Sequence, residues 1–218
     1  MGIKFSCASG SPYAWRVWLA LEHKALPYEL EEMTFSTGDL QQPELVAMQA
    51  RKVKIFDDDG FAMYESQVIL EYLEDAYPNS GNRLFPADVR QRGLVRRYIR
   101  YADVYLAQAL ETMVDEILFK TAAKWNSELI IEARTTFMKE FVYFEQQLQL
   151  NGDFLMGTPG AADFSLYPMI AVALRLELTE PDLAIRDGIG PRVRAWMKRM
   201  EALPYYEKTY PPHWRLGS

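Results

Sequence analysis

Alternating and helical patterns of apolar residues follow one another through the first part of the chain. The segment Ile3–Cys7 alternates apolar and polar side chains, which predicts a short strand. Apolar positions between Pro12 and His23 then recur at helical spacing, and the proline suits the first turn of a helix. Alternation returns over residues 26–33. Together these three segments predict a β-α-β unit.

A short helix, a hairpin and a longer helix are predicted next. Residues 39–48 have the pattern of a short irregular helix. Two short strand patterns, 53–56 and 61–64, flank the acidic turn 57–60 and predict a hairpin. Clear helical spacing then covers residues 66–76. The resulting order, β-α-β-α-β-β-α, is the order that an α+β thioredoxin-like domain requires.

The chain is expected to contain two domains. We assign residues 1–79 to the thioredoxin-like domain, because the elements above fill this stretch. Residues 80–88 have the Asn, Ser, Gly and Pro composition of a linker. From residue 89 onward nearly every apolar position follows helical spacing, so we expect an all-α domain over 89–218.

The overall charge argues against a nucleic-acid partner. The 218 residues carry 24 basic and 30 acidic side chains, and a net charge of −6 repels a polyanion. No apolar run approaches the ~20 residues that cross a membrane, and no basic and apolar leader is present at the start. We therefore expect a cytoplasmic protein that binds no membrane. One basic run in a helical pattern is interpreted as a solvated or subunit-facing stripe: Arg90, Arg92, Arg96, Arg97 and Arg100.

Thiol and imidazole groups are too few for a metal site or an internal disulfide. Cys7 is the only cysteine of the chain. The two histidines, His23 and His213, stand far apart and lack the spacing of metal ligands. We therefore expect no metal cofactor.

An acid and a hydroxyl stand side by side where the second hairpin strand gives way to a helix. Glu65 and Ser66 at this junction bring a carboxylate, a hydroxyl and the backbone amides of a helix N-terminus to one point. The hydroxyl and amides suit the carboxylate of an α-amino acid, and Glu65 suits its ammonium group. Taken alone, the pair favours the simpler interpretation of a helix N-cap.

Two further segments change this interpretation. Residues 11–21 open a helix with Ser-Pro-Tyr-Ala, and residues 157–168 open another with Gly-Ala-Ala-Asp. Together with residues 61–73, and in this order, they resemble the cytosolic glutathione transferase family over nearly the whole chain. The resemblance implies a thioredoxin-like domain followed by an all-helical one. It also implies glutathione as cosubstrate and a small apolar electrophile as the second substrate.

The resemblance implies that Ser11 activates the glutathione thiol. Glutaredoxin-like proteins carry Cys-Pro-Tyr-Cys at the matching site, but Ser11 and Ala14 replace both sulfurs here, so redox exchange is not expected. In serine-type glutathione transferases, a hydroxyl and a helix N-terminus at this place favour the thiolate over the thiol. We place Ser11 ahead of Ser9, Tyr13 and Cys7 for this role. Ser11 also suits an N-cap, and the two roles are compatible.

The resemblance also implies glutathione contacts just before the third strand. Family members carry a segment similar to Gly-Lys-Val-Pro there, and Lys52 and Val53 match its basic and main-chain contacts. Gln41 or Gln42 is a further candidate contact for the glycine end. Lys54 replaces the cis-proline of the family. The peptide before it is therefore either a cis bond that costs about 2.5–4 kcal/mol or a trans bond with altered contacts.

Three tyrosines are the expected contacts of the electrophile. The resemblance places Tyr101 and Tyr105 on the helix that lines the electrophile site, and Tyr13 beside Ser11. A tyrosine pair at helical spacing is also typical of a helical core. Trp214, near the end of the chain, is a candidate cap for the same site. Asp163 is expected to bond the backbone amides of the loop before its helix, with Gly160 in place of the usual capping hydroxyl.

Two functions from different classes remain open. The first is a homodimeric glutathione transferase that detoxifies small electrophiles by conjugation, dehalogenation or isomerisation. Ser11, Lys52, Glu65 and Ser66 favour it. The second is a non-catalytic interaction protein on the same fold, of the stringent-starvation or translation-factor type. Lys54 favours this alternative, because it removes the cis-proline at the glutathione site.

Overall fold

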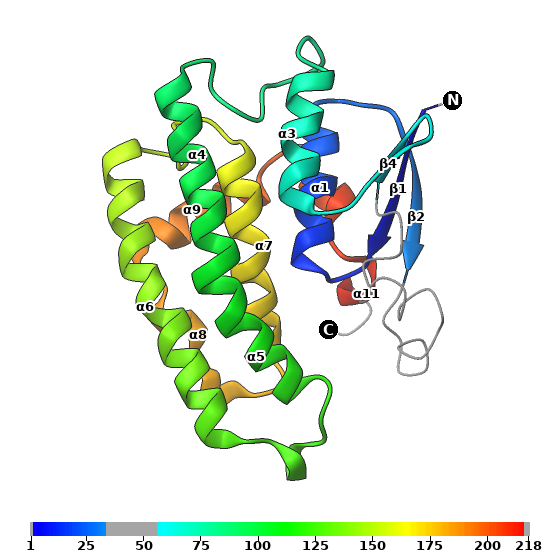
Figure 1. Cartoon of the computed structure of the whole chain (residues 1–218). Helices are drawn as coiled ribbons and strands as arrows, with labels where there is room; N and C mark the ends of the chain where they lie inside the picture. Colours follow the sequence, from blue (N-terminus) through cyan, green and yellow to red (C-terminus); the bar gives the residue numbers. More distant parts are fainter. Residues whose placement is uncertain (1, 34–55, 216–218) are drawn as a thin grey trace. The chain divides into compact units, whose positions relative to one another are not determined.

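The computed structural model describes residues 2–33 and 56–215, and the chain divides into two compact units. The first unit comprises residues 1–85 together with residues 204–218, and the second comprises residues 86–203. Figure 1 shows a sheet with helices in the first unit and helices alone in the second. The predicted fold class, a thioredoxin-like domain followed by an all-helical one, is confirmed.

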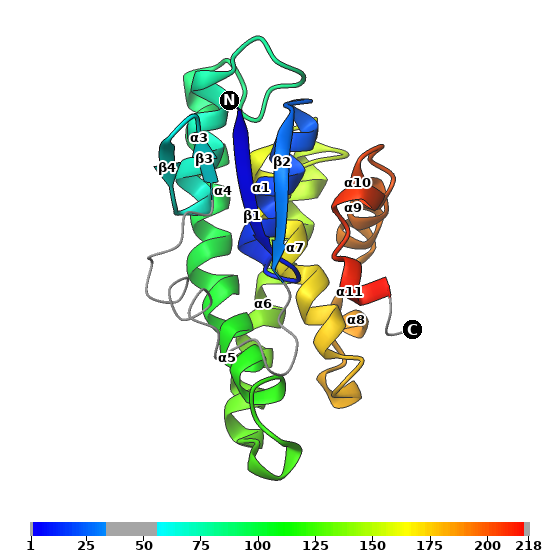
Figure 2. The same cartoon turned by 90° about the vertical axis from the view of Figure 1, so that its right-hand side faces the viewer.

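The first unit contains a four-stranded sheet in the order β2-β1-β3-β4 (Figure 2). β1 pairs in parallel with β2, whereas β3 runs antiparallel to both β1 and β4. The predicted β-α-β unit and hairpin are therefore confirmed where the chain is described, with the second strand beginning at Tyr28 instead of residue 26. The strands are β1 (Ile3–Ala8), β2 (Tyr28–Met33), β3 (Phe56–Asp58) and β4 (Phe61–Met63).

Two helices, α1 (Pro12–His23) and α3 (Ser66–Ala76), pack against each other in this unit. α1 begins as the sequence predicts, with Ser11 as the N-cap and Pro12 in the first turn. Every residue of α1 from Ala14 to Leu21 is buried, so this helix supplies much of the core of the first unit.

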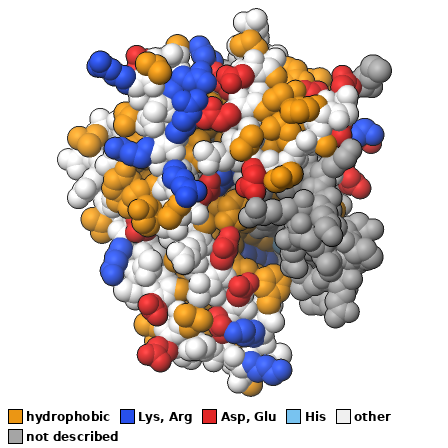
Figure 3. Space-filling view, in the orientation of Figure 1, with side chains coloured by type: hydrophobic (Ala, Val, Ile, Leu, Met, Phe, Trp, Pro, Cys, Tyr) orange, Lys and Arg blue, Asp and Glu red, His pale blue; other side chains and the backbone are white. Residues whose placement is uncertain are grey.

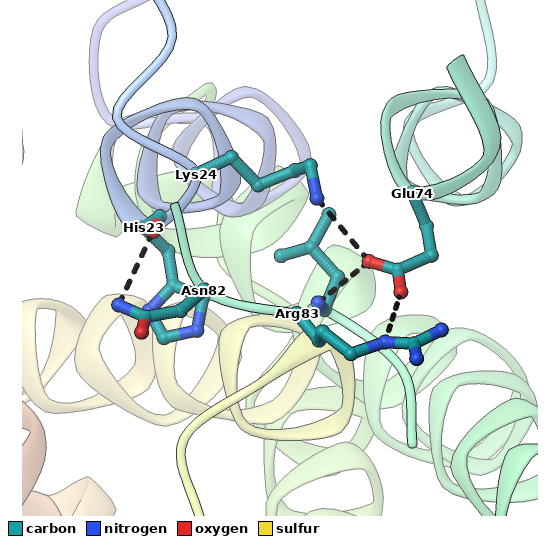
Figure 4. Close-up of polar contacts among 6 residues, drawn as sticks. His23, Lys24, Glu74, Asn82 and Arg83 are labelled. Atoms are coloured by element: carbon teal, nitrogen blue, oxygen red, sulfur yellow. Dashed lines mark hydrogen bonds and ion pairs between the residues drawn. The ribbon is translucent and has the colours of Figure 1, made fainter. Parts of the chain in front are cut away.

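A buried carboxylate ties the end of α1 to α3 (Figure 4). Glu74 of α3 accepts hydrogen bonds from Lys24 Nζ at 3.4 Å, Arg83 Nε at 2.9 Å and the Leu84 amide at 2.8 Å. The Lys24 side chain is fully buried and that of Glu74 is 1% exposed, so this ion pair is shielded from water. Gly81 passes beside Lys24 at a φ of 52°, where a Cβ would lie 2.4 Å from the Lys24 carbonyl.

The C-terminal segment, residues 204–215, belongs to the first unit and contains two short helices, α10 (Tyr206–Thr209) and α11 (Pro212–Arg215). The expected domain division grouped it with the helical domain, and the structure differs here. The reason is the aromatic content of the segment. The ring of Trp15 on α1 packs against Tyr206, Tyr210 and Trp214 at centroid distances of 5.5–6.2 Å.

The second unit contains a long helix interrupted by one turn of π-helix, followed by a bundle of further helices (Figure 1). α4 begins at the Asp88 N-cap, whose carboxylate accepts the amides of Arg90 and Gln91. The elements are α4 (Val89–Tyr101), η2 (Ala102–Leu106, π), α5 (Ala107–Ile117), η3 (Ala122–Lys124, 3₁₀), α6 (Ser127–Asn151), α7 (Ala161–Leu176), η4 (Pro181–Leu183, 3₁₀), α8 (Ile185–Gly188) and α9 (Pro191–Glu201).

Asp163 joins the start of α7 to the core of the second unit. Its buried carboxylate accepts hydrogen bonds from the Leu155 amide at 3.0 Å, the Gly160 amide at 3.2 Å and the Trp196 indole at 2.8 Å. Burial raises the pKa of Asp163 to about 6, against the opposing effect of these donors. The prediction that Asp163 bonds the preceding loop is confirmed, and its role is structural.

His23 should make the stability of the protein depend on pH. Its Nδ1 lies 2.6 Å from the Tyr205 hydroxyl, and burial lowers its pKa from 6.5 to about 4. Between these values the unfolded chain binds more protons than the folded chain, so the stabilisation is complete above pH 6.5 and is lost as pH falls toward 4. We expect the free energy of unfolding to fall by about 3 kcal/mol from this group, measured by urea denaturation.

The control for this experiment is His23→Gln, which keeps a polar side chain of similar length but does not titrate. Its unfolding free energy should vary less with acid than that of the wild type. Equal acid sensitivity in both proteins would contradict the assignment to His23.

Candidate functional site

Two helices of the first unit begin at the same end of the sheet, where β1 and β4 finish. β1 and β4 both run antiparallel to β3, so they point in the same direction. α1 follows the end of β1 and α3 follows the end of β4. The topology therefore brings the loop of Ser11 and the junction of Glu65 and Ser66 to one side of this unit. Both loops present backbone amides there, which suit a negatively charged ligand.

Ser11 combines the N-cap of α1 with a hydroxyl that remains able to donate. Its backbone is extended, at a φ of −71° and a ψ of 123°, and its amide donates to the Ala8 carbonyl at 2.9 Å. The hydroxyl oxygen accepts the Ala14 amide at 3.4 Å, which is long for a capping bond. Because the oxygen is the acceptor in this bond, the hydroxyl hydrogen is available to a ligand.

The other candidates near Ser11 are less suited to a role in chemistry. Ser9 is 2% exposed, and its hydroxyl lies 2.8 Å from Nδ1 of His213. Cys7 is buried in β1, and burial, assisted by the negative charge of Glu32, raises its pKa to about 12. It therefore remains a thiol at neutral pH. Tyr13 is half-buried and packs beside the guanidinium of Arg16, 5.4 Å from its ring centroid.

Glu65 holds an unusual backbone conformation at the start of α3. Its φ is 69° and its ψ is 95°, a region that residues other than glycine rarely adopt. Such a conformation costs on the order of 1–3 kcal/mol. The side chain is exposed and makes no capping bond, so the strain does not serve the helix start. Ser66 follows as the first helical residue. The plain N-cap interpretation of this pair is therefore wrong in its geometry.

Several predicted glutathione contacts lie outside the described residues. These are the two glutamines and the segment that replaces the cis-proline motif: Gln41, Gln42, Lys52, Val53 and Lys54.

The tyrosines of the second unit differ in exposure. Tyr101 ends α4 and stacks on Tyr143 of α6 at 4.3 Å between ring centroids. Burial, followed by a hydrogen bond to Glu140, raises the pKa of Tyr101. Tyr105 lies in the π-helical turn and is 53% exposed. Tyr101 is partly exposed and packs in an aromatic cluster with Tyr105, Tyr143 and Phe144, whereas Tyr105 offers more of its side chain to solvent. A π-turn within a long helix often marks a functional site.

Trp214, near the end of the chain, is a candidate cap for the electrophile site. Instead its side chain is 8% exposed and packs edge-on against Trp15 within the first unit. This residue is therefore part of a hydrophobic core.

Two negative findings apply to residues 2–33 and 56–215. No group of three His, Cys, Asp or Glu side chains in these ranges could hold a metal ion. No helix among them is long and apolar enough to span a membrane.

Comparisons with known proteins decide the family. The sequence profile of the glutathione S-transferase N-terminal domain matches residues 7–81, and that of the C-terminal domain matches residues 114–199. The glutathione S-transferase hmp2 of Hypomyces subiculosus is 33% identical over 149 residues, which are 63% of this chain and 69% of that protein. The chain belongs to the glutathione S-transferase family. Glutathione S-transferase A of Pleuronectes platessa is 25% identical over 210 residues, 94% of this chain and 90% of that protein.

Solved structures of glutathione transferases share this fold. The beta-etherase LigF of Sphingobium sp. strain SYK-6 has a TM-score of 0.80 at 20% identity, covering 96% of this chain and 99% of that one. A transferase from Burkholderia graminis, solved with two glutathione molecules bound per subunit, has a TM-score of 0.79 at 20% identity. It covers 97% of this chain and 88% of that one. Relatives of several classes are similar at such levels, so the class of this family member is not resolved.

Proposed function

We propose that this glutathione S-transferase is catalytic and activates the glutathione thiol with Ser11. The observation that carries the proposal is the pairing of two helix N-termini at one sheet edge, one with the donor-capable hydroxyl of Ser11 and the other with the strained Glu65. Strain of this kind persists where the surrounding structure enforces it, and it is frequent at ligand clamps.

Glutathione fits this arrangement group by group. Its γ-glutamyl end has an ammonium, which pairs with the Glu65 carboxylate, and a carboxylate, which accepts from the Ser66 hydroxyl and the first amides of α3. Its thiol then lies at the N-terminus of α1, where the Ser11 hydroxyl donates to sulfur. Both the hydroxyl and the positive end of the helix favour the thiolate and so lower the pKa of the thiol.

The reaction uses the sulfur of the cosubstrate as the nucleophile. The thiol releases its proton to solvent, and the thiolate attacks an electrophilic carbon of a small apolar molecule. With an organic halide, the carbon–sulfur bond forms while the carbon–halogen bond breaks, and halide departs with the bonding electrons. Conjugation of this kind, dehalogenation and isomerisation all start from the same bound thiolate, and detoxification is the cellular role that we assign. Tyr13 and Tyr105 are the proposed contacts of the electrophile, and Tyr101 supports Tyr105, whose ring centroid is 4.7 Å away.

A non-catalytic interaction protein is the second candidate. The observation that favours it is Lys54, which stands where the family carries a cis-proline. Titration calorimetry with glutathione separates the two functions. A dissociation constant in the micromolar to low-millimolar range supports the enzyme, and no measurable heat supports the interaction protein.

Replacing Ser11 by alanine should lower turnover of an aryl halide on the order of 10- to 1000-fold. The hydroxyl stabilises charge mainly as the thiolate forms, so the affinity for glutathione should change little. Ser11→Thr is the matched control, because it retains a hydroxyl and an N-cap oxygen. Steady-state kinetics measure both variants. Full activity in Ser11→Ala would reduce Ser11 to a helix cap and refute the mechanism.

Replacing Glu65 by glycine should raise the stability of the protein and weaken its binding of glutathione. Glu65→Gly relieves the strain of a φ of 69°, so the free energy of unfolding should rise by about 1 kcal/mol. The same change removes the carboxylate that pairs with the ammonium, so glutathione should bind more weakly by roughly 1–3 kcal/mol. Ser66→Ala should weaken binding in the same direction.

Chemical denaturation and titration calorimetry test these two effects on the same protein samples. The control is Glu65→Gln, which keeps the strained backbone and the length of the side chain but not its charge. It should weaken binding without any gain in stability. Unchanged affinity in all three variants would leave the pair with no role in ligand binding.

We further propose a homodimer, on the basis of two exposed surfaces. In the first unit, large apolar side chains near the β4–α3 junction are half exposed: Phe61, Tyr64 and Val68. Figure 3 shows Lys and Arg side chains over the region of α4. In the second unit, α4 carries a basic stripe: Arg90, Arg92, Arg96, Arg97 and Arg100. A contact between copies would cover the first surface and pair the second with acidic side chains.

Light scattering at micromolar concentration should give twice the 25.2 kDa mass of one chain. Tyr64→Glu should shift the mass toward the single chain, because it places a charge in an apolar contact. Val142→Glu is a control at an exposed apolar residue of α6 that belongs to neither surface. A wild-type mass of one chain would refute the dimer.

A further inference from the structure

The C-terminal segment, residues 204–215, makes hydrogen bonds with the rest of the first unit near both ends of α1. Near the C-terminal end of α1, His23 Nδ1 and the Tyr205 hydroxyl lie 2.6 Å apart. Between the two ends, the Trp15 indole donates to the Thr209 hydroxyl at 3.2 Å. Near the N-terminal end of α1, His213 meets the loop that leads to Ser11. The segment therefore spans the length of the helix that presents the candidate catalytic hydroxyl.

The contact of His213 with this loop involves the two residues directly before Ser11. Nδ1 of His213 lies 2.8 Å from the Ser9 hydroxyl, which is buried. Gly10 has a φ of 86°, and a Cβ built on it would lie 2.8 Å from Cε1 of His213 and 3.2 Å from Nε2. The imidazole thus covers the face of Gly10 where any other residue would place its side chain. Only glycine fits both the backbone angle and this close approach.

Backbone bonds fix the loop on either side of Gly10. The Ser9 amide donates to the Met33 carbonyl of β2, and the Ser11 amide donates to the Ala8 carbonyl of β1, each at 2.9 Å. Gly10 lies between these two anchors and is the most permissive residue of the loop. The imidazole of His213 makes the closest approach to it, and Nε1 of Trp214 lies next, 3.5 Å from the position of a Cβ. Freedom at Gly10 would change the direction of the Ser11 hydroxyl without breaking either anchor.

We infer that His213 is a positioning residue for Ser11, acting through Ser9 and Gly10 and not by contact with the substrate. The inference rests on the proposed role of Ser11 in thiolate formation. A donor that is fixed in direction stabilises a developing charge better than a mobile one, because no reorganisation is needed when the charge forms. The end of the chain, about 200 residues from Ser11 in sequence, therefore contributes to the pKa of the bound thiol.

The test compares substitutions at the two ends of the segment. His213→Ala and Ser9→Ala each remove the contact beside Ser11. Tyr205→Phe is the matched control, because it removes the hydrogen bond to His23 at the other end of the segment and leaves His213 in place. His213→Asn is the conservative variant, since its side-chain amide can reach the position of Nδ1 and bond to Ser9. The readouts are the pKa of enzyme-bound glutathione from ultraviolet titration, kcat, the glutathione Kd and the Tm.

His213→Ala and Ser9→Ala should each raise the pKa of the bound thiol by about one unit, which is a tenfold loss of thiolate stabilisation. Turnover should fall by about 10- to 100-fold, as for a small misplacement of a catalytic group, while the glutathione Kd changes less than about threefold. His213→Asn should recover most of the loss. Tyr205→Phe should lower the Tm but keep the wild-type pKa of the bound thiol.

Several outcomes would overturn the inference. If His213→Ala and Ser9→Ala lower only the Tm and keep the wild-type thiol pKa, the segment is structural and His213 positions nothing. If Tyr205→Phe raises the thiol pKa as much as His213→Ala does, general loosening and not the local contact is responsible. A wild type that binds no glutathione, or a fully active Ser11→Ala, would refute the proposed function itself. The Ser11 variant therefore separates the two failures.

Discussion

The buried carboxylate of Glu74 is the interaction on which the geometry of the first unit depends. It receives the fully buried Lys24 ammonium from the end of α1, together with Arg83 and the Leu84 amide from the segment after α3. Removing one partner of such a pair leaves an uncompensated charge and typically costs about 3–5 kcal/mol. These interactions of Glu74 therefore oppose any shift of α1 relative to α3. Because both helices begin at the same sheet edge, fixing their relative position also fixes Ser11 relative to Glu65.

At the candidate site, polar groups make fewer hydrogen bonds within the protein than they could. Asp163 illustrates the opposite case, because its carboxylate is fully buried and accepts three hydrogen bonds from the protein itself. The Ser11 hydroxyl, by contrast, accepts one long hydrogen bond. Glu65 has a strained backbone at a φ of 69°, and its side chain makes no capping bond to α3. A sequence with stronger helix caps at these two positions would make the protein more stable. Free donors and an exposed carboxylate are what a charged ligand requires.

Local sequence patterns predict the helices and strands of this fold. The features that they do not predict depend on contacts between residues far apart in the sequence. The Ser11-Pro12 start of α1 and the bonding of Asp163 follow from neighbouring residues, so the sequence predicts them correctly. The positive φ of Glu65 has no signal in the neighbouring residues. The contact between Ser9 and His213 joins residues 204 positions apart, and a lone histidine near the chain end carries no such information. The position of residues 204–215 was missed for the same reason.

The thiol chemistry of the chain agrees with a mechanism in which the protein positions a reactive group of its ligand. Its single cysteine lies in the core of the sheet, with a pKa raised to about 12, so no protein thiolate forms at neutral pH. Ser11 and Ala14 occupy the places where a redox protein of this fold carries its two sulfurs. Under the proposed mechanism, the nucleophile is therefore the sulfur of the ligand. The protein would contribute helix dipoles and the Ser11 hydroxyl directed at that sulfur, so a misdirected hydroxyl would be almost as harmful as a missing one.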